Sequence, residues 1–130
     1  MGYDLHITRA PNWAENSGVE ITTDEWLAVV EADPELSLAP QNGPYFVEWS
    51  GRSKNPDPWL DWFAGNVYSK APDSALLRKM VLLADRLGAR VQGDDGEFYS
   101  GNESLDDNPA AAATVDDTGP ASWWRKLMGR

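Results

Sequence analysis

The segment from Pro72 to Gly88 constrains the fold most strongly, because its apolar residues recur at helical spacing throughout. Pro72–Asp73–Ser74 is typical of a helix start, and Gly88 of a helix end. The apolar positions are Leu76, Leu77, Met80, Val81, Leu83, Ala84 and Leu87. A helix with so wide an apolar face must cover another apolar surface, so we expect it to lie across a sheet.

The strands of that sheet are indicated by alternation and by β-branched and aromatic composition. Tyr3, Leu5 and Ile7 alternate with Asp4, His6 and Thr8, which predicts an opening strand with one buried face. Further strands are expected at 45–49, in a hairpin of 59–63 and 67–68 turning at Gly65-Asn66, and in a closing hairpin of 89–92 and 97–99. A short helix capped by Asp57-Pro58 is the alternative for residues 59–63.

A first helix is predicted after Thr22, because Thr22-x-x-Glu25 matches a capping box. Trp26, Leu27 and Val30 form its apolar stripe, and Pro34 ends it. The order of elements predicts a single α+β domain, with a mostly antiparallel sheet and two helices packed on it.

The domain is expected to span residues 1–99. Residues 100–121 are polar, lack core-forming periodicity and contain four consecutive alanines, so we interpret them as a flexible tail. Residues 122–130 form a short basic, aromatic and amphipathic segment that includes Trp123, Trp124, Arg125, Lys126 and Leu127. This segment is either inert or a docking motif for a partner, a membrane surface or its own domain.

Composition excludes several classes of site. The chain has no cysteine, which removes disulfides and thiolate metal sites, and its one histidine excludes two-histidine metal motifs. We therefore expect no cofactor and no bound metal. A net charge of −10 argues against binding nucleic acid through its phosphates. The start of the chain has neither a signal peptide pattern nor a membrane-spanning run, so we expect a cytoplasmic protein.

The negative charge is concentrated near the beginning of the chain. Residues 1–48 hold nine acids and one base, whereas residues 49–99 hold seven of each. Acids of this part that surround the first helix are Glu20, Asp24, Glu25, Glu31 and Glu35, with no bases at i+4 to compensate them. They form either a solvated face or a surface that attracts a basic partner.

Three other groups of side chains are candidate sites. Asp94, Asp95 and Glu97 cluster at a turn, where they either bind a cation, contact a basic partner or are simply solvated. Asp4, His6 and Thr8 share a strand face, but neighbours ~6–7 Å apart do not form a proton relay. Trp59 and Trp62, beside Asp57 and Asp61, are either core residues or a platform for a sugar ring.

Three motifs resemble a family of small, largely uncharacterised acidic bacterial proteins. They are Tyr3–Arg9 (YDLHITR), Glu25-Trp26 followed by Asp33-Pro34-Glu35, and Leu87–Glu97, which contains GDDGE. The resemblance covers roughly residues 1–99. It implies a role for some members as immunity proteins beside secreted toxins, and it implies no catalytic residue.

We therefore expect a binding protein rather than an enzyme, most concretely an immunity protein that neutralises a basic toxin. The expected contact residues are Glu20, Asp24, Glu25, Glu31, Glu35, Trp59, Asp61, Trp62, Asp94, Asp95 and Glu97. One alternative is a small hydrolase or metal-dependent enzyme that uses His6 or the Asp94/Asp95/Glu97 cluster. Another is a carbohydrate-binding or regulatory scaffold domain. The oligomeric state is left open by the sequence.

Overall fold

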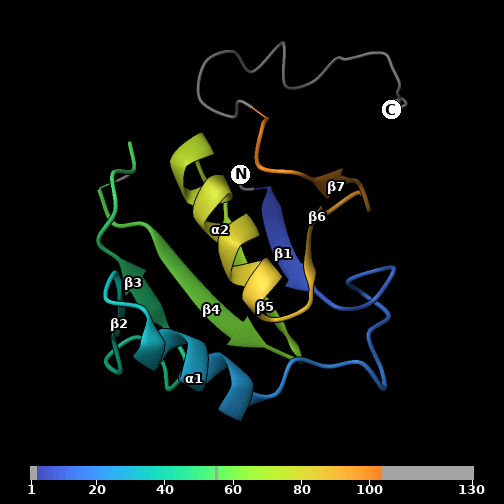
Figure 1. The fold of residues 1–130 in the computed structure, drawn as a ribbon, viewed down its shortest axis with the longest axis horizontal. Helices are drawn as coiled ribbons and strands as arrows, with labels where there is room; N and C mark the ends of the chain where they lie inside the picture. The colour runs from blue at the N-terminus through green and yellow to red at the C-terminus, as the bar shows by residue number, and fades with distance from the viewer. Residues whose placement is uncertain (1–2, 55, 104–130) are drawn as a thin grey trace.

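The computed structural model describes residues 3–54 and 56–103, which form an α+β domain as expected. A seven-stranded sheet runs in the order β2-β3-β4-β5-β1-β6-β7, and every neighbouring pair is antiparallel (Figure 1). The strands are β1 (Asp4–Thr8), β2 (Leu36–Leu38), β3 (Val47–Trp49), β4 (Trp59–Phe63), β5 (Asn66–Lys70), β6 (Arg90–Gly93) and β7 (Phe98–Tyr99).

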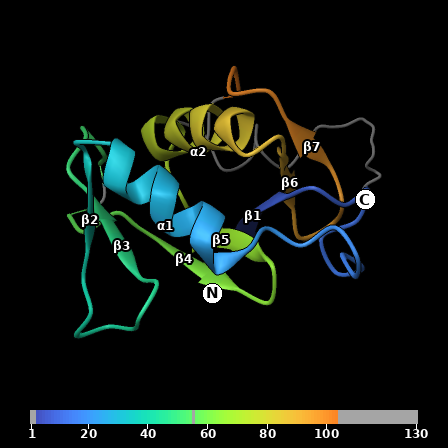
Figure 2. The ribbon, with the colours of Figure 1, turned by 60° about the horizontal axis from the view of Figure 1, so that its bottom comes forward.

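The helices α1 (Thr23–Ala32) and α2 (Ser74–Arg86) lie on the same face of the sheet (Figure 2). The α2 helix packs on β1 and β6, and α1 packs on β2. All the residues of the predicted α2 stripe are buried or partly buried, which confirms that this helix covers the sheet. The core between the layers is built from Trp26, Leu5, Ile7, Leu60, Val67, Leu77, Met80 and Leu83, each at most 1% exposed.

The ends of both helices follow local chemistry. Thr22 and Glu25 form the predicted capping box, with the Thr22 hydroxyl accepting from the Glu25 N–H at 3.1 Å. Asp73 caps α2 by accepting from the N–H of Leu76 at 2.9 Å. Gly88, with a φ of +63°, ends the second helix as predicted.

The segment 59–63 is a strand, which confirms the hairpin and removes the short-helix alternative. Its turn lies one residue earlier than expected, because Phe63 pairs with Asn66 and leaves Ala64-Gly65 as the loop. Both loop residues have positive φ, +53° and +86°, as tight hairpin turns require. Asn66 is withdrawn from the turn because its side chain is buried and hydrogen-bonded to the loop before α1.

Two features of the sheet differ from the prediction. The short edge strand β2 was not predicted, because three residues are too few to show a period, and it forms by pairing with β3. The opening strand β1 was expected to bury one face, but His6 and Thr8 are also buried, at 6% and 0% exposure. The second face of β1 is covered because the chain after it folds back over His6.

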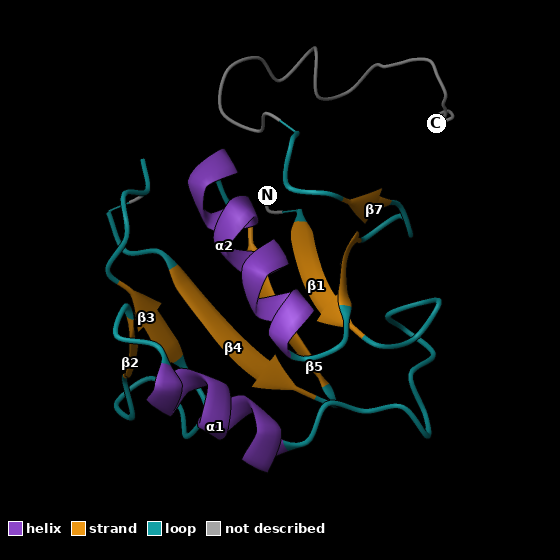
Figure 3. Cartoon of the chain, viewed as in Figure 1, coloured by secondary structure: helices purple, strands orange, loops and turns teal. Residues whose placement is uncertain are grey.

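The described chain continues past β7 to Glu103. Figure 3 colours β7 orange with the other strands. Gly101 lies beside Val81 of α2, and Glu103 accepts hydrogen bonds from the N–H groups of Ser100 and Gly101. The rest of the predicted tail, with Trp123, Trp124, Arg125, Lys126 and Leu127, lies outside the described residues.

A buried ion cluster joins the two helices. Lys79 of α2 is 7% exposed, and its Nζ lies 2.7 Å from Asp33 Oδ2 and 2.8 Å from Glu35 Oε1. Arg86 reaches the same Asp33 oxygen at 2.9 Å. Burial is the largest single influence on Asp33 and raises its pKa, but the hydrogen bonds from Lys79, the Glu35 N–H and Arg86, with the charge of Lys79, together outweigh it and leave that pKa below its usual value. The cluster therefore stays charged and fixes the end of α1 to α2.

The acid stability of the domain is expected to depend on a second pair, Arg9 and Glu25, whose Nη2 and Oε2 are 2.8 Å apart. Hydrogen bonds from Arg9 lower the pKa of Glu25 from 4.5 to about 2. Because the folded-state pKa is the lower one, the stabilisation is complete above pH 4.5 and is lost as the pH falls toward 2. We expect Arg9→Gln to flatten the loss of thermal stability over this range.

Arg90→Gln is the matched control for that acid titration, because Arg90 stacks on Phe98 and pairs with no carboxylate among the described residues. Midpoints of thermal unfolding, followed by circular dichroism from pH 6 to pH 2, would separate the two. Identical pH profiles for both variants would contradict a role for the Arg9–Glu25 pair.

Candidate functional site

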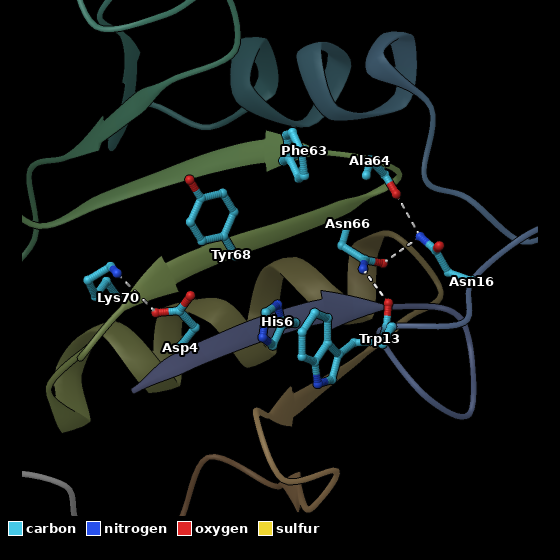
Figure 4. Close-up of a pocket in the computed structure, with 10 residues that line it drawn as sticks. Asp4, His6, Trp13, Asn16, Phe63, Ala64, Asn66, Tyr68 and Lys70 are labelled. Atoms are coloured by element: carbon cyan, nitrogen blue, oxygen red, sulfur yellow. Dashed lines mark hydrogen bonds and ion pairs between the residues drawn. The ribbon is translucent and has the colours of Figure 1, made fainter. Parts of the chain in front are cut away.

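The sheet face opposite the helices carries a pocket of about 470 Å³ (Figure 4). It lies over the middle of the sheet, between β1, β5 and the β4–β5 turn, and is closed at one side by the loop that follows β1. Its lining is mixed polar and aromatic: Asp4, His6, Trp13, Ala14, Asn16, Phe63, Ala64, Asn66, Tyr68 and Lys70. Such a combination is typical of ligand pockets, in which a few polar groups set specificity.

Strand register brings the polar residues of the pocket together. Asp4 and His6 are two residues apart on β1, so both point to the same face. Across the antiparallel pair, His6 is opposite Tyr68, and Asp4 is opposite Lys70. The alternation in the sequence predicted that Asp4 and His6 share a face of β1. That Tyr68 and Lys70 of β5 lie on the same face follows only from the pairing of β1 with β5.

The loop over His6 is held by amide side chains, of which Gln92 and Asn66 are buried. Gln92, 1% exposed, accepts from the N–H of Trp13 at 2.6 Å and donates to the carbonyl of Pro11 at 3.0 Å. Asn66 donates to the carbonyl of Trp13 at 2.9 Å, and Asn16 donates to the carbonyl of Ala64 at 2.8 Å. The loop is therefore fixed to β5 and β6 by side chains on both sides.

His6 is oriented by two contacts. Its ring stacks on the indole of Trp13, with centroids 3.8 Å apart and planes 6° from parallel. Its Nε2 lies 2.9 Å from Asp94 Oδ1, and the ring donates this hydrogen bond to the carboxylate. The second Asp94 oxygen accepts from the N–H of Asp4 at 2.9 Å. Asp94, at the turn after β6, thus positions both the backbone of Asp4 and the ring of His6.

Asp4 is the group in this site whose hydrogen bonding is incomplete. Its Oδ1 is buried and has no hydrogen-bond partner in the part of the chain that the structure describes. The nearest cation, Nζ of Lys70, is 3.9 Å away, which is beyond hydrogen-bond distance. A buried carboxylate oxygen without a donor is destabilising, so this atom is ready to accept a ligand.

The other carboxylates of the predicted turn do not join Asp94. Glu97 accepts from the hydroxyls of Tyr3 and Tyr99, the latter at 2.8 Å, and Asp95 is exposed. Burial is the largest cause that raises the pKa of both tyrosines, and the charge of Glu97 and the hydrogen bond to it raise this pKa further. The two phenols therefore stay protonated and act as donors. Among the described residues, Asp94 is instead grouped with Asp4 and His6.

The acids around α1 divide into two sets. Glu25 is held by Arg9, and Glu35 is held by Lys79 and by the indole N–H of Trp49 at 3.0 Å. The hydrogen bond from Lys79 is the main reason that the pKa of Glu35 lies below its usual value. The other three acids are exposed and have no ion pair in residues 3–54 and 56–103; these are Glu20, Asp24 and Glu31. Bases that are distant in sequence therefore neutralise part of the charge.

The two predicted platform tryptophans lie on opposite faces of β4, because they are three positions apart. Trp59 stacks on Phe46 at 5.2 Å and meets Tyr68 edge-on at 5.5 Å. Trp62 contacts Tyr45 and donates to the carbonyl of Ile21 at 2.8 Å. The pair therefore forms no single surface for a sugar ring.

Asp61 lies across from Tyr68 in the β4–β5 pair. Burial raises the pKa of Asp61 above its usual value, and burial and then the Asp61 charge raise that of Tyr68. Asp61 was expected beside a ligand surface, and it lies on β4, the strand next to the pocket-lining β5.

Several residues of the pocket were missed in the sequence. Trp13, Asn16, Asn66 and Lys70 come from a loop and from β5, and no motif distinguishes them. The one available signal was the alternation that placed Asp4 and His6 on one face.

The described chain is thus an antiparallel α+β domain with helices on one sheet face and a polar, aromatic pocket on the other. No protein-family model matches this chain, and neither a curated protein nor a solved structure matches it. Over residues 3–54 and 56–103, neither helix has the length and apolar character needed to cross a membrane.

Proposed function

We propose that this chain is a protein-binding domain that holds a basic partner at the surface around the β4–β5 turn. We define this turn surface as Val19, Glu20, Asp24 and Phe63. The observation that carries the proposal is the side chain of Phe63, which is 71% exposed and lies two residues before Gly65, the turn residue that is in close contact with the unpaired Glu20. An exposed aromatic anchor next to uncompensated charge is typical of interfaces with charged partners.

The turn surface is held together by contacts between its two segments. The N–H of Ile21 donates to the carbonyl of Gly65 at 2.8 Å. A side chain at Gly65 would come within 2.6 Å of Glu20 Cβ, so the turn and Glu20 are in close contact. Val19 is a second exposed apolar residue, at 43%. The arrangement thus offers apolar area and negative charge on a fixed backbone.

The charge of the whole molecule supports the same partner chemistry. The net charge of −10 raises the rate of association with a basic protein at low salt. The resemblance to bacterial immunity proteins adds the finer proposal that the partner is a toxin, which the chain would meet in the cytoplasm. A neighbouring gene for a secreted protein with a toxic C-terminal domain would support this finer proposal, and a metabolic operon would contradict it.

Binding of a deca-arginine peptide, followed by NMR chemical shifts and fluorescence at low salt, tests the surface. Shift changes are expected at residues 19–24 and 63–65. The double variant E20Q/D24N should bind about tenfold more weakly, which corresponds to about 1.4 kcal/mol. F63A should weaken binding while leaving the charge unchanged.

The matched control is E48Q/D57N, which removes two exposed acids elsewhere and has the same net charge as E20Q/D24N. The proposal predicts that the control binds nearly as well as the natural chain. Equal weakening in both double variants would mean that only net charge matters, and would exclude a binding site at the turn.

A further inference from the structure

The pocket brings together three potential metal ligands from distant parts of the chain. One carboxylate oxygen each of Asp4 and Asp94 and a ring nitrogen of His6 all lie within 4.8 Å of one another. Two of these residues come from β1 and the third from the turn after β6. In a tetrahedral zinc site, donor atoms ~2.1 Å from the metal lie roughly 3.4 Å apart, so small side-chain movements would suffice.

The unsatisfied oxygen of Asp4 is an independent sign that a ligand belongs here. Oδ1 is buried without a hydrogen-bond donor among the described residues. Asp4 nevertheless lines a pocket that is large enough to admit a small ligand. Lys70 balances part of the charge at 3.9 Å, but its side chain is 59% exposed and free to turn outward. A bound cation would give Asp4 the partner that it lacks.

The surrounding contacts orient the three ligands. Asp94 Oδ2 accepts from the N–H of Asp4, which leaves Oδ1 directed at His6. Trp13 stacks on the His6 ring, and Gln92 holds the backbone of Trp13. Outer contacts of this kind raise metal affinity because they fix ligand orientation before binding.

We propose that Asp4, His6 and Asp94 bind a divalent transition-metal ion such as Zn²⁺, with water in the remaining position. One imidazole and two carboxylates favour this class over Ca²⁺ and Mg²⁺, which prefer oxygen ligands alone. The metal takes the place of the hydrogen between His6 Nε2 and Asp94 Oδ1. In the neutral ring, Nε2 gives up this proton to solvent and Nδ1 takes one up, so the ligand is the neutral imidazole and no net proton is released. This inference does not rest on the proposed protein partner: Phe63 lines the pocket and belongs to the turn surface, but none of the three metal ligands is part of that surface.

Titration of the full-length chain with Zn²⁺ by calorimetry, and with Co²⁺ by visible absorption, tests the site. One equivalent of metal is expected, with shifts of the His6 imidazole signals in NMR. D94N and H6Q should each weaken binding at least tenfold. Lys70→Met should tighten binding severalfold, because it removes a competing positive charge.

Asp95→Asn is the matched control, since it removes the same charge one residue away from Asp94. It should bind metal as the natural chain does, and so should E20Q/D24N. Circular dichroism would confirm that the variants fold, and Asp4→Asn provides a second ligand variant if H6Q does not. Equal affinity in D94N and D95N, or no gain in Lys70→Met, would overturn the proposal in favour of diffuse binding by surface acids.

Discussion

Replacing Trp26 with alanine is expected to reduce the free energy of unfolding by about 3–5 kcal/mol. Trp26 is fully buried between α1 and the sheet, and its indole N–H donates to the carbonyl of Tyr45 at 3.1 Å. The truncation removes the largest side chain of the core and leaves a cavity. It also leaves the Tyr45 carbonyl without its donor. Urea denaturation at neutral pH would measure the loss.

Trp26→Phe separates the two contributions, because it keeps an aromatic ring and removes the N–H group. This variant is expected to lose about 1 kcal/mol from the missing hydrogen bond, in addition to a smaller packing loss. Leu82→Ala, at a site that is 58% exposed on α2, should change stability by less than about 0.5 kcal/mol. A loss below 1 kcal/mol for Trp26→Ala would contradict a central place for this residue in the core.

The second large effect is expected for Lys79→Met, which should cost about 3 kcal/mol. The variant leaves Asp33, 4% exposed, with the partly exposed Arg86 as its one charged partner among the described residues, beside the hydrogen bond from the Glu35 N–H. The loss arises from a buried and incompletely paired carboxylate, not from lost apolar contacts, since methionine has a similar volume.

The control for Lys79→Met is Arg78→Met, which removes the neighbouring positive charge from an exposed site on the same helix. It should change stability by less than about 0.5 kcal/mol. Lowering the pH should narrow the difference in the free energy of unfolding between Lys79→Met and the natural chain, because protonation of Asp33 removes the uncompensated charge. A difference that stays constant down to pH 2 would contradict this explanation.

Much of the architecture was predictable because its signals are local. The α2 stripe, the Thr22 capping box and the Gly88 stop each depend on residues within a few positions, and the structure confirms all three. The closing hairpin was also correct, with Gly96 at a φ of +92°. Two features were not predicted correctly: β2 was missed, because it is too short for a pattern, and the hairpin turn was placed one residue too late, because an alanine adopts a positive φ at Ala64-Gly65.

The candidate site was less predictable, because its residues meet only through strand pairing. The sequence placed Asp4 and His6 on one face and singled out Asp94, but it linked Asp94 with Asp95 and Glu97 instead. Likewise, the acids of the first helix had no bases nearby in sequence. Arg9 and Lys79 nevertheless reach Glu25 and Glu35 in the folded chain.

The positions of the helices and of most strands, and the excess of negative charge, can be derived from the amino-acid sequence, because periodicity and caps depend on neighbouring residues and charge depends on composition. Which charges are neutralised and which side chains share the pocket depends instead on the folded arrangement of distant segments. His6 and Asp94 are 88 positions apart, and Lys79 and Asp33 are 46 apart. Contacts over such separations depend on the register and order of the strands, and these are selected by the packing of the whole core.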